Sequence, residues 1–140
     1  MVSDAFVLDA SVTAAWCFAD EASEHTAALL ASVGRKTAVV PGLWHFETAS
    51  LLLRAERRGR ISRVVCTVFI ETLMQLPIET DTESESRAHG PVLALARTHE
   101  LTPYDAAYLD LAIRRALPLA TRDQDLVRAA RECSVDLVPT

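Results

Sequence analysis

Short apolar runs alternate along this chain with longer segments that have the periodicity of amphipathic helices. The short runs predict strands over Ala5–Leu8, Thr37–Val40, Ile78–Thr80, Leu119–Thr121 and Val135–Val138. The longer segments predict helices over Ser23–Val33, Leu43–Arg58, Ser62–Leu76, Asp81–Glu100, Pro103–Ala116 and Asp123–Glu132. Strands that alternate with helices are typical of βαβ units. We therefore expect an α/β, three-layer fold, in which a central parallel sheet of about four to five short strands is flanked by helices.

Capping residues mark several ends of these helices. Ser23, Ser62 and Thr102 stand where an N-cap side chain is expected, and Gly34 and Gly59 stand where helices stop. A further helix is expected after the first strand, with Ser11 as its possible cap.

Two expectations concern the longer helices. In Leu43–Arg58, one face is expected to carry Leu43, Phe46, Ser50 and Leu53, with Glu47 beside this stripe. The segment Asp81–Glu100 is expected to form two helical pieces, because Gly90-Pro91 interrupts the helical pattern.

Length and composition fit a single domain over residues 1–140, since half of the residues are hydrophobic and 24% are charged. No apolar run reaches the ~20 residues that a membrane-spanning helix needs, and the first residues lack the pattern of a signal peptide. We therefore expect a cytoplasmic protein with no membrane contact. Cys17, Cys66 and Cys133 are widely spaced, which favours reduced thiols over disulfides or a zinc site.

The formal net charge is −5, which argues against a protein that coats nucleic acid through bulk electrostatics. The segment Arg54–Arg63 nevertheless carries five arginines and one glutamate. A basic patch is compatible with an acidic total if the acids are gathered elsewhere, as a metal site would gather them.

Two acids follow predicted strands. Asp9 comes directly after the first strand, and Asp123 comes two residues after Leu119–Thr121. Because ligands of parallel sheets bind at the carboxyl ends of the strands, we expect these acids to share one site. Each acid also stands where an N-cap is expected, so capping is the competing interpretation.

Four more acids lie on predicted helices. Glu47 stands among apolar neighbours, where an unpaired carboxylate needs a metal ion or a basic partner. Asp105 completes a variant capping box with Thr102, and a capped position is compatible with a place in the site. Asp110 is about 140° around the helix from Asp105, so we expect it to face solvent. Asp125 is a possible auxiliary of Asp123.

Clustered acids of this kind require a cation. Two carboxylates about 4 Å apart repel by ~4 kcal/mol at an effective dielectric constant near 20. Ligands that offer only oxygen select Mg²⁺ or Mn²⁺, and the four histidines show no zinc-like spacing with cysteine. The chain has neither a glycine-rich phosphate loop nor a Gly-x-Ser-x-Gly elbow.

Three segments carry these residues in a recognisable order and spacing: VLDASVTAAW, PGLWHFETASLLLRA, and LTPYDAAYLDLA followed by LATRDQDL. With them the chain resembles the PIN-domain family over essentially its whole length, specifically the VapC-type toxins of bacterial toxin–antitoxin pairs. The resemblance implies a PIN fold with an acidic pocket at the carboxyl edge of the sheet.

The resemblance also implies roles for individual residues. It gives the four metal-binding acids as Asp9, Glu47, Asp105 and Asp123. It gives Ser11 and Thr121 as nearby hydroxyls and Asp125 as an occasional extra acid. The chain departs from the family at Ser50, where an asparagine is frequent three residues after the glutamate.

The activity that the resemblance implies is Mg²⁺- or Mn²⁺-dependent hydrolysis of RNA phosphodiesters. The implied partners are an antitoxin whose C-terminal segment covers the acidic pocket and a second copy of the chain in a homodimer. Candidates for contact with the RNA backbone are Arg54, Arg57, Arg58 and Arg60. The same arginines are equally suited to a solvated helix end or to a surface for dimerisation or the antitoxin.

Two other classes of protein remain as alternatives. One is a PIN fold that only binds a partner through an inactive pocket, although all four acids are present. The other is a receiver-like phosphoacceptor domain, which also gathers acids around Mg²⁺. Such domains use a lysine near the last strand, and the sole lysine here is Lys36.

Overall fold

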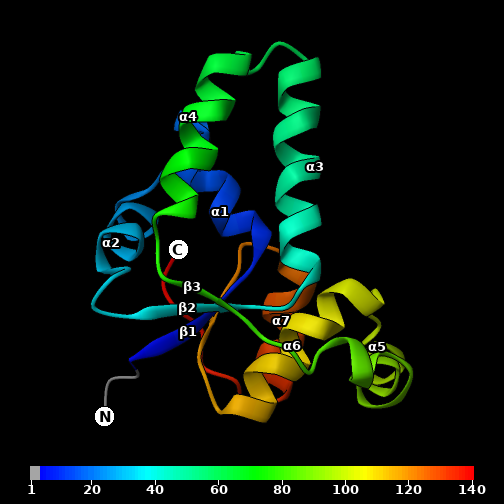
Figure 1. The fold of residues 1–140 in the computed structure, drawn as a ribbon. Helices are drawn as coiled ribbons and strands as arrows, with labels where there is room; N and C mark the ends of the chain where they lie inside the picture. The colour runs from blue at the N-terminus through cyan, green and yellow to red at the C-terminus, as the bar shows by residue number, and fades with distance from the viewer. Residues whose placement is uncertain (1–3) are drawn as a thin grey trace.

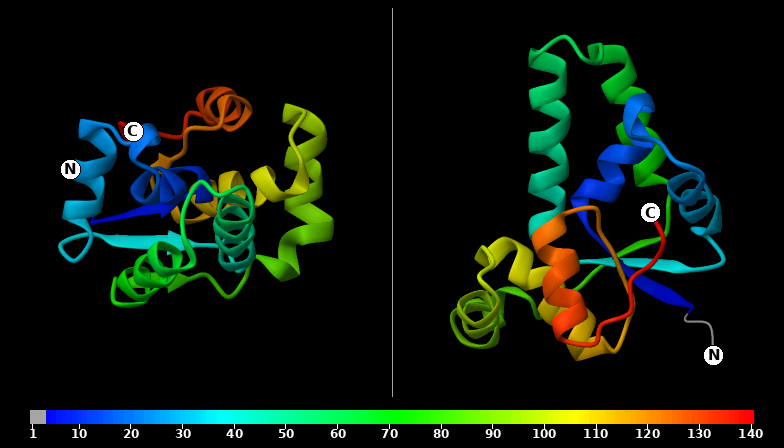
Figure 2. Two further views of the ribbon diagram at one scale, coloured as in Figure 1. Left: turned by 90° about the horizontal axis from the view of Figure 1, so that it is seen from above. Right: turned by 180° about the vertical axis from the view of Figure 1, so that it is seen from behind.

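The computed structural model describes residues 4–140 and contains one parallel sheet (Figure 1). Its strands are β1 (Ala5–Leu8), β2 (Thr37–Val40), β3 (Ile78–Thr80) and β4 (Leu119–Ala120), in the spatial order β3-β2-β1-β4. The helices are α1 (Ala10–Cys17), α2 (Glu24–Ser32), α3 (Leu43–Arg57), α4 (Arg63–Met74), α5 (Leu93–His99), α6 (Pro103–Arg115) and α7 (Gln124–Glu132). They lie on both faces of the sheet (Figure 2), which confirms the predicted α/β fold.

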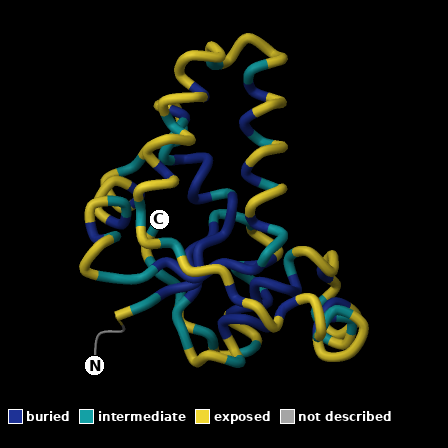
Figure 3. The backbone as a smooth tube through the Cα atoms, viewed as in Figure 1, coloured by how far each residue is buried: buried dark blue, intermediate teal, exposed yellow. Residues whose placement is uncertain are grey.

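The centre of the core is β1, because β2 and β4 pair with it on either side. Val7 lies opposite Val39 of β2 and Leu119 of β4, and these three side chains are fully buried. Figure 3 shows β1 and β2 in the buried centre of the molecule, whereas the edge strand β3 is largely exposed and the hairpin of α3 and α4 is exposed at its tip. The apolar runs of β1, β2 and β4 therefore correspond to strands that are covered on both faces.

The predicted caps hold three helices. Ser23 forms a capping box with Thr26, the Ser62 hydroxyl accepts a hydrogen bond from the Val65 N–H, and Thr102 accepts one from the Asp105 N–H. Ser11 does not cap a helix, contrary to the prediction. It lies inside α1, and Asp9 occupies the N-cap position.

The buried face of α3 differs from the predicted one. Trp44, Thr48 and Leu52 are buried, whereas Phe46 is 80% exposed and Leu53 is 42% exposed. The Trp44 indole N–H donates to the Thr13 hydroxyl of α1 at 3.0 Å, so this side of α3 faces α1. Apolar residues on the other side remain uncovered, because the α3–α4 hairpin projects away from the sheet (Figure 1).

Gly90-Pro91 does not break a helix, contrary to the prediction. Both residues lie within a π-helical turn, Ala88–Val92, that continues directly into α5. The wider turn accommodates a proline ring that would clash in a regular α-helix. The segment begins later than expected, because the Asp81 carboxylate accepts hydrogen bonds from the Glu83 N–H and the Ser84 hydroxyl and favours a local turn.

The predicted strand Val135–Val138 is reduced to a single bridge between Leu119 and Leu137. The Leu119 N–H donates to the Asp136 carbonyl at 2.8 Å, and the Val138 N–H donates to the Leu119 carbonyl at 2.9 Å. Because β4 is only two residues long, it offers little backbone for a fifth strand to pair with.

Asp110 does not face solvent, so that prediction is wrong. Its carboxylate is 4% exposed and accepts two hydrogen bonds from the Arg87 guanidinium, at 2.7 and 2.9 Å. Arg114 lies on the same side, where it binds Asp81. The angle of about 140° correctly predicted that Asp105 and Asp110 lie on different sides of α6. Spacing within one helix does not reveal that another segment covers the side of α6 that carries Asp110.

Two smaller expectations concern the thiols and the membrane. Cys17, Cys66 and Cys133 are all free, as predicted. Within residues 4–140, no helix is long and apolar enough to cross a membrane.

Candidate active site

Asp9 lies at the carboxyl end of β1 and is 5% exposed. Its Oδ2 atom accepts hydrogen bonds from the Ser11 hydroxyl and the Thr121 hydroxyl, both at 2.7 Å. Asp9 occupies the N-cap position of α1, but its side chain makes no capping hydrogen bond. The carboxylate is therefore held by two neutral donors at the edge of the sheet, and capping does not explain its presence.

The same two hydroxyls fix the loop after β4. The Arg122 N–H donates to the Ser11 oxygen at 3.0 Å, and the Asp123 N–H donates to the Thr121 oxygen at 3.1 Å. Asp123 in turn caps α7, since its Oδ1 atom accepts from the Leu126 N–H at 3.0 Å. Both interpretations of Asp123 therefore hold together: it caps a helix and it lies beside Asp9.

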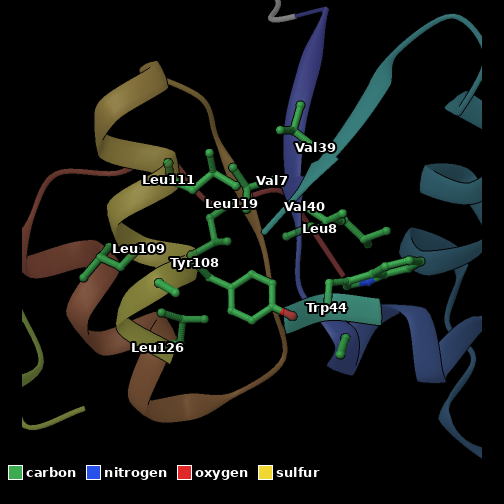
Figure 4. Packing of buried hydrophobic residues seen from close by; sticks show 14 of the residues in the cluster. Val7, Leu8, Val39, Val40, Trp44, Tyr108, Leu109, Leu111, Leu119 and Leu126 are labelled. Carbon is green, nitrogen blue, oxygen red and sulfur yellow. The ribbon is translucent and has the colours of Figure 1, made fainter. Parts of the chain in front are cut away.

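Glu47 comes from α3 and is held by Tyr108 of α6. The Tyr108 hydroxyl donates to the Glu47 Oε1 atom at 2.6 Å. Burial raises the pKa of Tyr108 well above its ordinary value, so the phenol keeps its proton and remains a donor. Figure 4 shows the Tyr108 ring among core side chains, with its oxygen reaching the start of α3 near Trp44.

All four predicted acids line one pocket of about 470 Å³. They come from the end of β1, from α3, from α6 and from the loop before α7. The pocket is also lined by Ser11, Glu21, Ser50, Arg54 and Arg60, among others. Asp125 does not line it: this residue is on the surface, where its carboxylate is 3.7 Å from Arg128.

The acids affect one another electrostatically. Burial raises the pKa of Asp105 to about 7, and the charges of Asp123, Asp9, Glu47 and Asp125 add to this effect. Burial likewise raises the pKa of Asp9, against the hydrogen bonds from Ser11 and Thr121, and the pKa of Glu47, against the hydrogen bond from Tyr108. The pocket therefore has more negative charge than its surroundings stabilise, and such a site favours a cation.

The donor atoms fit a hard divalent ion, because they are carboxylate and hydroxyl oxygens without sulfur or imidazole. Within residues 4–140, however, no three His, Cys, Asp or Glu side chains lie close enough together to hold one ion. The carboxylates surround a shared space and would have to converge when an ion binds.

The arginines of the basic segment have different surroundings. Arg60 is 2.6 Å from Asp20 and 2.8 Å from Glu21, and its guanidinium lies over the Phe18 ring at 4.0 Å. Arg54 lines the pocket as well, while Arg57 and Arg58 are exposed near the end of α3. Of the four arginines predicted to contact RNA, Arg54 thus lines the pocket, is exposed, and forms no salt bridge among the described residues.

The fold and the pocket define an α/β protein whose acidic site lies at the carboxyl edge of a parallel sheet. Comparison with protein families gives the same result, since the PIN-domain model matches residues 6–132. The chain therefore belongs to the PIN-domain family, whose members are typically nucleases and usually depend on metal ions.

Solved structures with similar folds come from an archaeon and a bacterium. PAE2754 from Pyrobaculum aerophilum is 23% identical, with a TM-score of 0.66 and coverage of 89% of this chain and 78% of that chain. FitAcB from Neisseria gonorrhoeae is 20% identical, with a TM-score of 0.61 and coverage of 96% of each chain. At these identities the similarity shows the fold alone. A comparison with curated protein sequences finds no match.

Sequence reasoning missed Tyr108, the partner of Glu47. The available signal was its position three residues after Asp105, which places both side chains on one side of α6. The partner itself was not predictable, because Glu47 is 61 residues away in the sequence.

The raised pKa of Asp105 predicts how stability depends on pH. Between its unfolded value near 4 and its folded value of about 7, the folded protein binds more protons than the unfolded chain. The free energy of unfolding of the metal-free protein should therefore fall as pH rises through this window. Asp105→Asn should make this dependence shallower without abolishing it, because the raised pKa values of Asp9 and Glu47 remain. It should also raise the melting temperature at pH 8 by roughly 3 °C, or about 1 kcal/mol for a half-buried group.

Thermal unfolding in EDTA at several pH values measures this effect. Asp136→Asn, which changes an exposed carboxylate, is the matched control and should leave the slope unchanged. If the melting temperatures of wild type and Asp105→Asn changed equally with pH, the raised pKa of Asp105 would be contradicted.

Proposed function

We propose that this chain is a Mg²⁺- or Mn²⁺-dependent endoribonuclease and the toxin component of a VapC-type toxin–antitoxin pair. The observation that carries the proposal is the set of four carboxylates, from distant segments of the chain, around one pocket. Membership of the PIN-domain family supports a nuclease. The resemblance of the three sequence segments to VapC-type toxins supports RNA as the substrate.

Asp9, Glu47, Asp105 and Asp123 would hold the ion. When bound there, Mg²⁺ or Mn²⁺ would supply Lewis-acid chemistry, lowering the pKa of a water and offsetting charge on the phosphate. Among the protein's own groups, Ser11 and Thr121 orient the Asp9 carboxylate. Asp105 is suited to orient a water molecule, because its half-buried carboxylate lines the same pocket as the other three acids.

The acids should be required for cleavage but not for folding. Asp9→Asn and Asp105→Asn should each lower the rate of Mg²⁺-dependent RNA cleavage by at least ~100-fold, because each removes a charge that only the loaded site needs. Glu79→Gln, which alters an exposed acid of β3, should retain the wild-type rate. Cleavage of a labelled RNA, with circular dichroism to verify folding, tests this, and full activity in both site variants would refute the assignment.

The non-catalytic alternative is a PIN fold that binds a partner through an inactive pocket. Calorimetric titration with Mn²⁺ separates the two, since failure to bind Mn²⁺ would favour the binding module. The receiver-like alternative has no structural support: Lys36 precedes β2 and lies at the amino ends of the strands, opposite to the edge that carries Asp9.

Arg54 should contribute more to RNA binding than Arg57. Both are exposed arginines on α3, but only Arg54 lines the pocket. Arg54→Ala should therefore raise the KM for RNA several-fold and weaken its salt dependence, while kcat changes little. Arg57→Ala is the matched control, and equal effects of the two substitutions on KM would contradict this placement.

The partners implied by the resemblance need uncovered surface, and the structure has such a surface. A groove of about 350 Å³ between α3 and α4 is lined mainly by apolar residues, and Met74 at its rim is 80% exposed. Val64 and Val68 are also exposed on α4. An apolar surface of this kind supports contact with an antitoxin or a second copy of the chain.

We expect expression of the chain alone to arrest growth. Co-expression of the protein encoded by the upstream neighbouring gene should relieve the arrest, because that protein would cover the acidic pocket. Growth curves with and without the neighbour test this, with Asp9→Asn as a non-toxic control. Normal growth with the wild-type chain alone would contradict the toxin role but leave the nuclease proposal standing.

A further inference from the structure

Tyr108 connects the hydrophobic core with the acidic pocket. It is the largest of the side chains that are fully buried, and it packs within the main apolar cluster. Its one polar atom, the phenol oxygen, points out of that cluster toward α3 and donates to Glu47 (Figure 4). A phenylalanine would fill the same space, so packing does not explain the hydroxyl.

The acceptor of this hydrogen bond matters for the site. A buried phenol requires some hydrogen-bond partner, and a backbone carbonyl would satisfy it. Here the phenol donates to a carboxylate that lines the pocket, while the Ala10 backbone also interacts with the phenol. Tyr108 and Glu47 belong to different helices. The bond at 2.6 Å has the short length of a hydrogen bond to a charged acceptor.

The orientation of the Glu47 carboxylate depends on one hydrogen bond, whereas that of the Asp9 carboxylate is shared between two. Asp9 has a short side chain that two hydroxyls hold. Glu47 has one more rotatable bond, and Tyr108 is the single side chain among the described residues that donates a hydrogen bond to it. Without that donor, the Glu47 carboxylate would be free to occupy several rotamers, and a ligand would have to order it.

The arrangement also links two acids through one helix. Asp105 and Tyr108 are three residues apart on α6, so one side of this helix presents an acid to the pocket and fixes a second acid from α3. The hydrogen bond occupies Oε1 of Glu47, and no described residue donates a hydrogen bond to Oε2.

We infer that Tyr108 is a positioning residue of the acidic site: its hydroxyl orients the Glu47 carboxylate toward a divalent cation in the pocket. The inference rests on the proposed metal site and adds a residue that does not touch the ion. Partners of metal ligands that act in this way typically change metal affinity by roughly 10- to 100-fold.

Tyr108→Phe removes only the hydroxyl and keeps the ring in the core. Tyr104→Phe is a matched control, because it deletes the same group from the same helix at a position that is 63% exposed. Mn²⁺ titration by calorimetry reports the dissociation constant separately from the number of sites per chain. We expect Tyr108→Phe to weaken Mn²⁺ binding roughly 10-fold or more, with the stoichiometry unchanged, and Tyr104→Phe to match the wild type.

A merely structural role gives a different result. It would lower the melting temperature of Tyr108→Phe in EDTA and reduce the fraction of chains that bind, but leave the dissociation constant of the folded fraction unchanged. That outcome overturns the inference while the proposed function stands. Absence of Mn²⁺ binding by the wild type would instead refute the metal site and the inference with it.

A double variant tests whether Tyr108 acts through Glu47. In a Glu47→Ala background, adding Tyr108→Phe should cause no further loss of Mn²⁺ affinity, because the carboxylate that the hydroxyl orients is already absent. Paramagnetic resonance of free Mn²⁺ at millimolar concentrations measures affinities in this weaker range. An equal loss in the Glu47→Ala and wild-type backgrounds would show that the hydroxyl acts independently, and would overturn the inference.

Discussion

The two hydrogen bonds to Asp9 are the interaction on which the site depends. Parallel pairing places Leu8 of β1 beside Ala120 of β4, so the residues that follow, Asp9 and Thr121, meet at the carboxyl edge of the sheet. Burial of a carboxylate costs several kcal/mol, and a hydrogen bond to a charged group offsets roughly 1.5–3 kcal/mol of this. Because Ser11 and Thr121 are neutral donors, they stabilise Asp9 without cancelling its charge. Their oxygens accept from the Arg122 and Asp123 N–H groups, so the same contacts set the path of the chain into α7.

The acids on the two sides of α6 have different electrostatic surroundings. On the side away from the pocket, Asp110 is bound by Arg87, and the neighbouring Arg114 binds Asp81. On the pocket side, Asp105 faces other carboxylates, and burial together with their charges raises its pKa to about 7. The first arrangement neutralises buried acids and stabilises the fold, whereas the second concentrates unbalanced negative charge in one place. Arg54 and Arg60 also line the pocket, but among the described residues neither forms a salt bridge with its four acids, which leaves these carboxylates for a cation from solution.

The fold and the composition of the pocket were largely predictable from the sequence, and the exceptions have physical causes. Apolar runs such as Ala5–Leu8 identify buried strands, and the rule that sites lie at the carboxyl ends of parallel strands brought Asp9 and Asp123 together. The buried face of α3 was not predictable, because it depends on tertiary contacts such as the one between Trp44 and Thr13, which lie 31 residues apart. The burial of Asp110 and the role of Tyr108 depend on partners in distant segments, Arg87 and Glu47, which periodicity within one helix does not reveal.

The central claim is that four acids from separate segments form one metal site. A crystal structure of the wild-type chain with Mn²⁺, measured for the anomalous scattering of manganese, tests it most directly. If these acids form one metal site, an anomalous peak should appear in the pocket within coordination distance of carboxylate oxygens from at least two of the four acids Asp9, Glu47, Asp105 and Asp123. A pocket without manganese at saturating concentration, or a peak bound only by other residues, would contradict it.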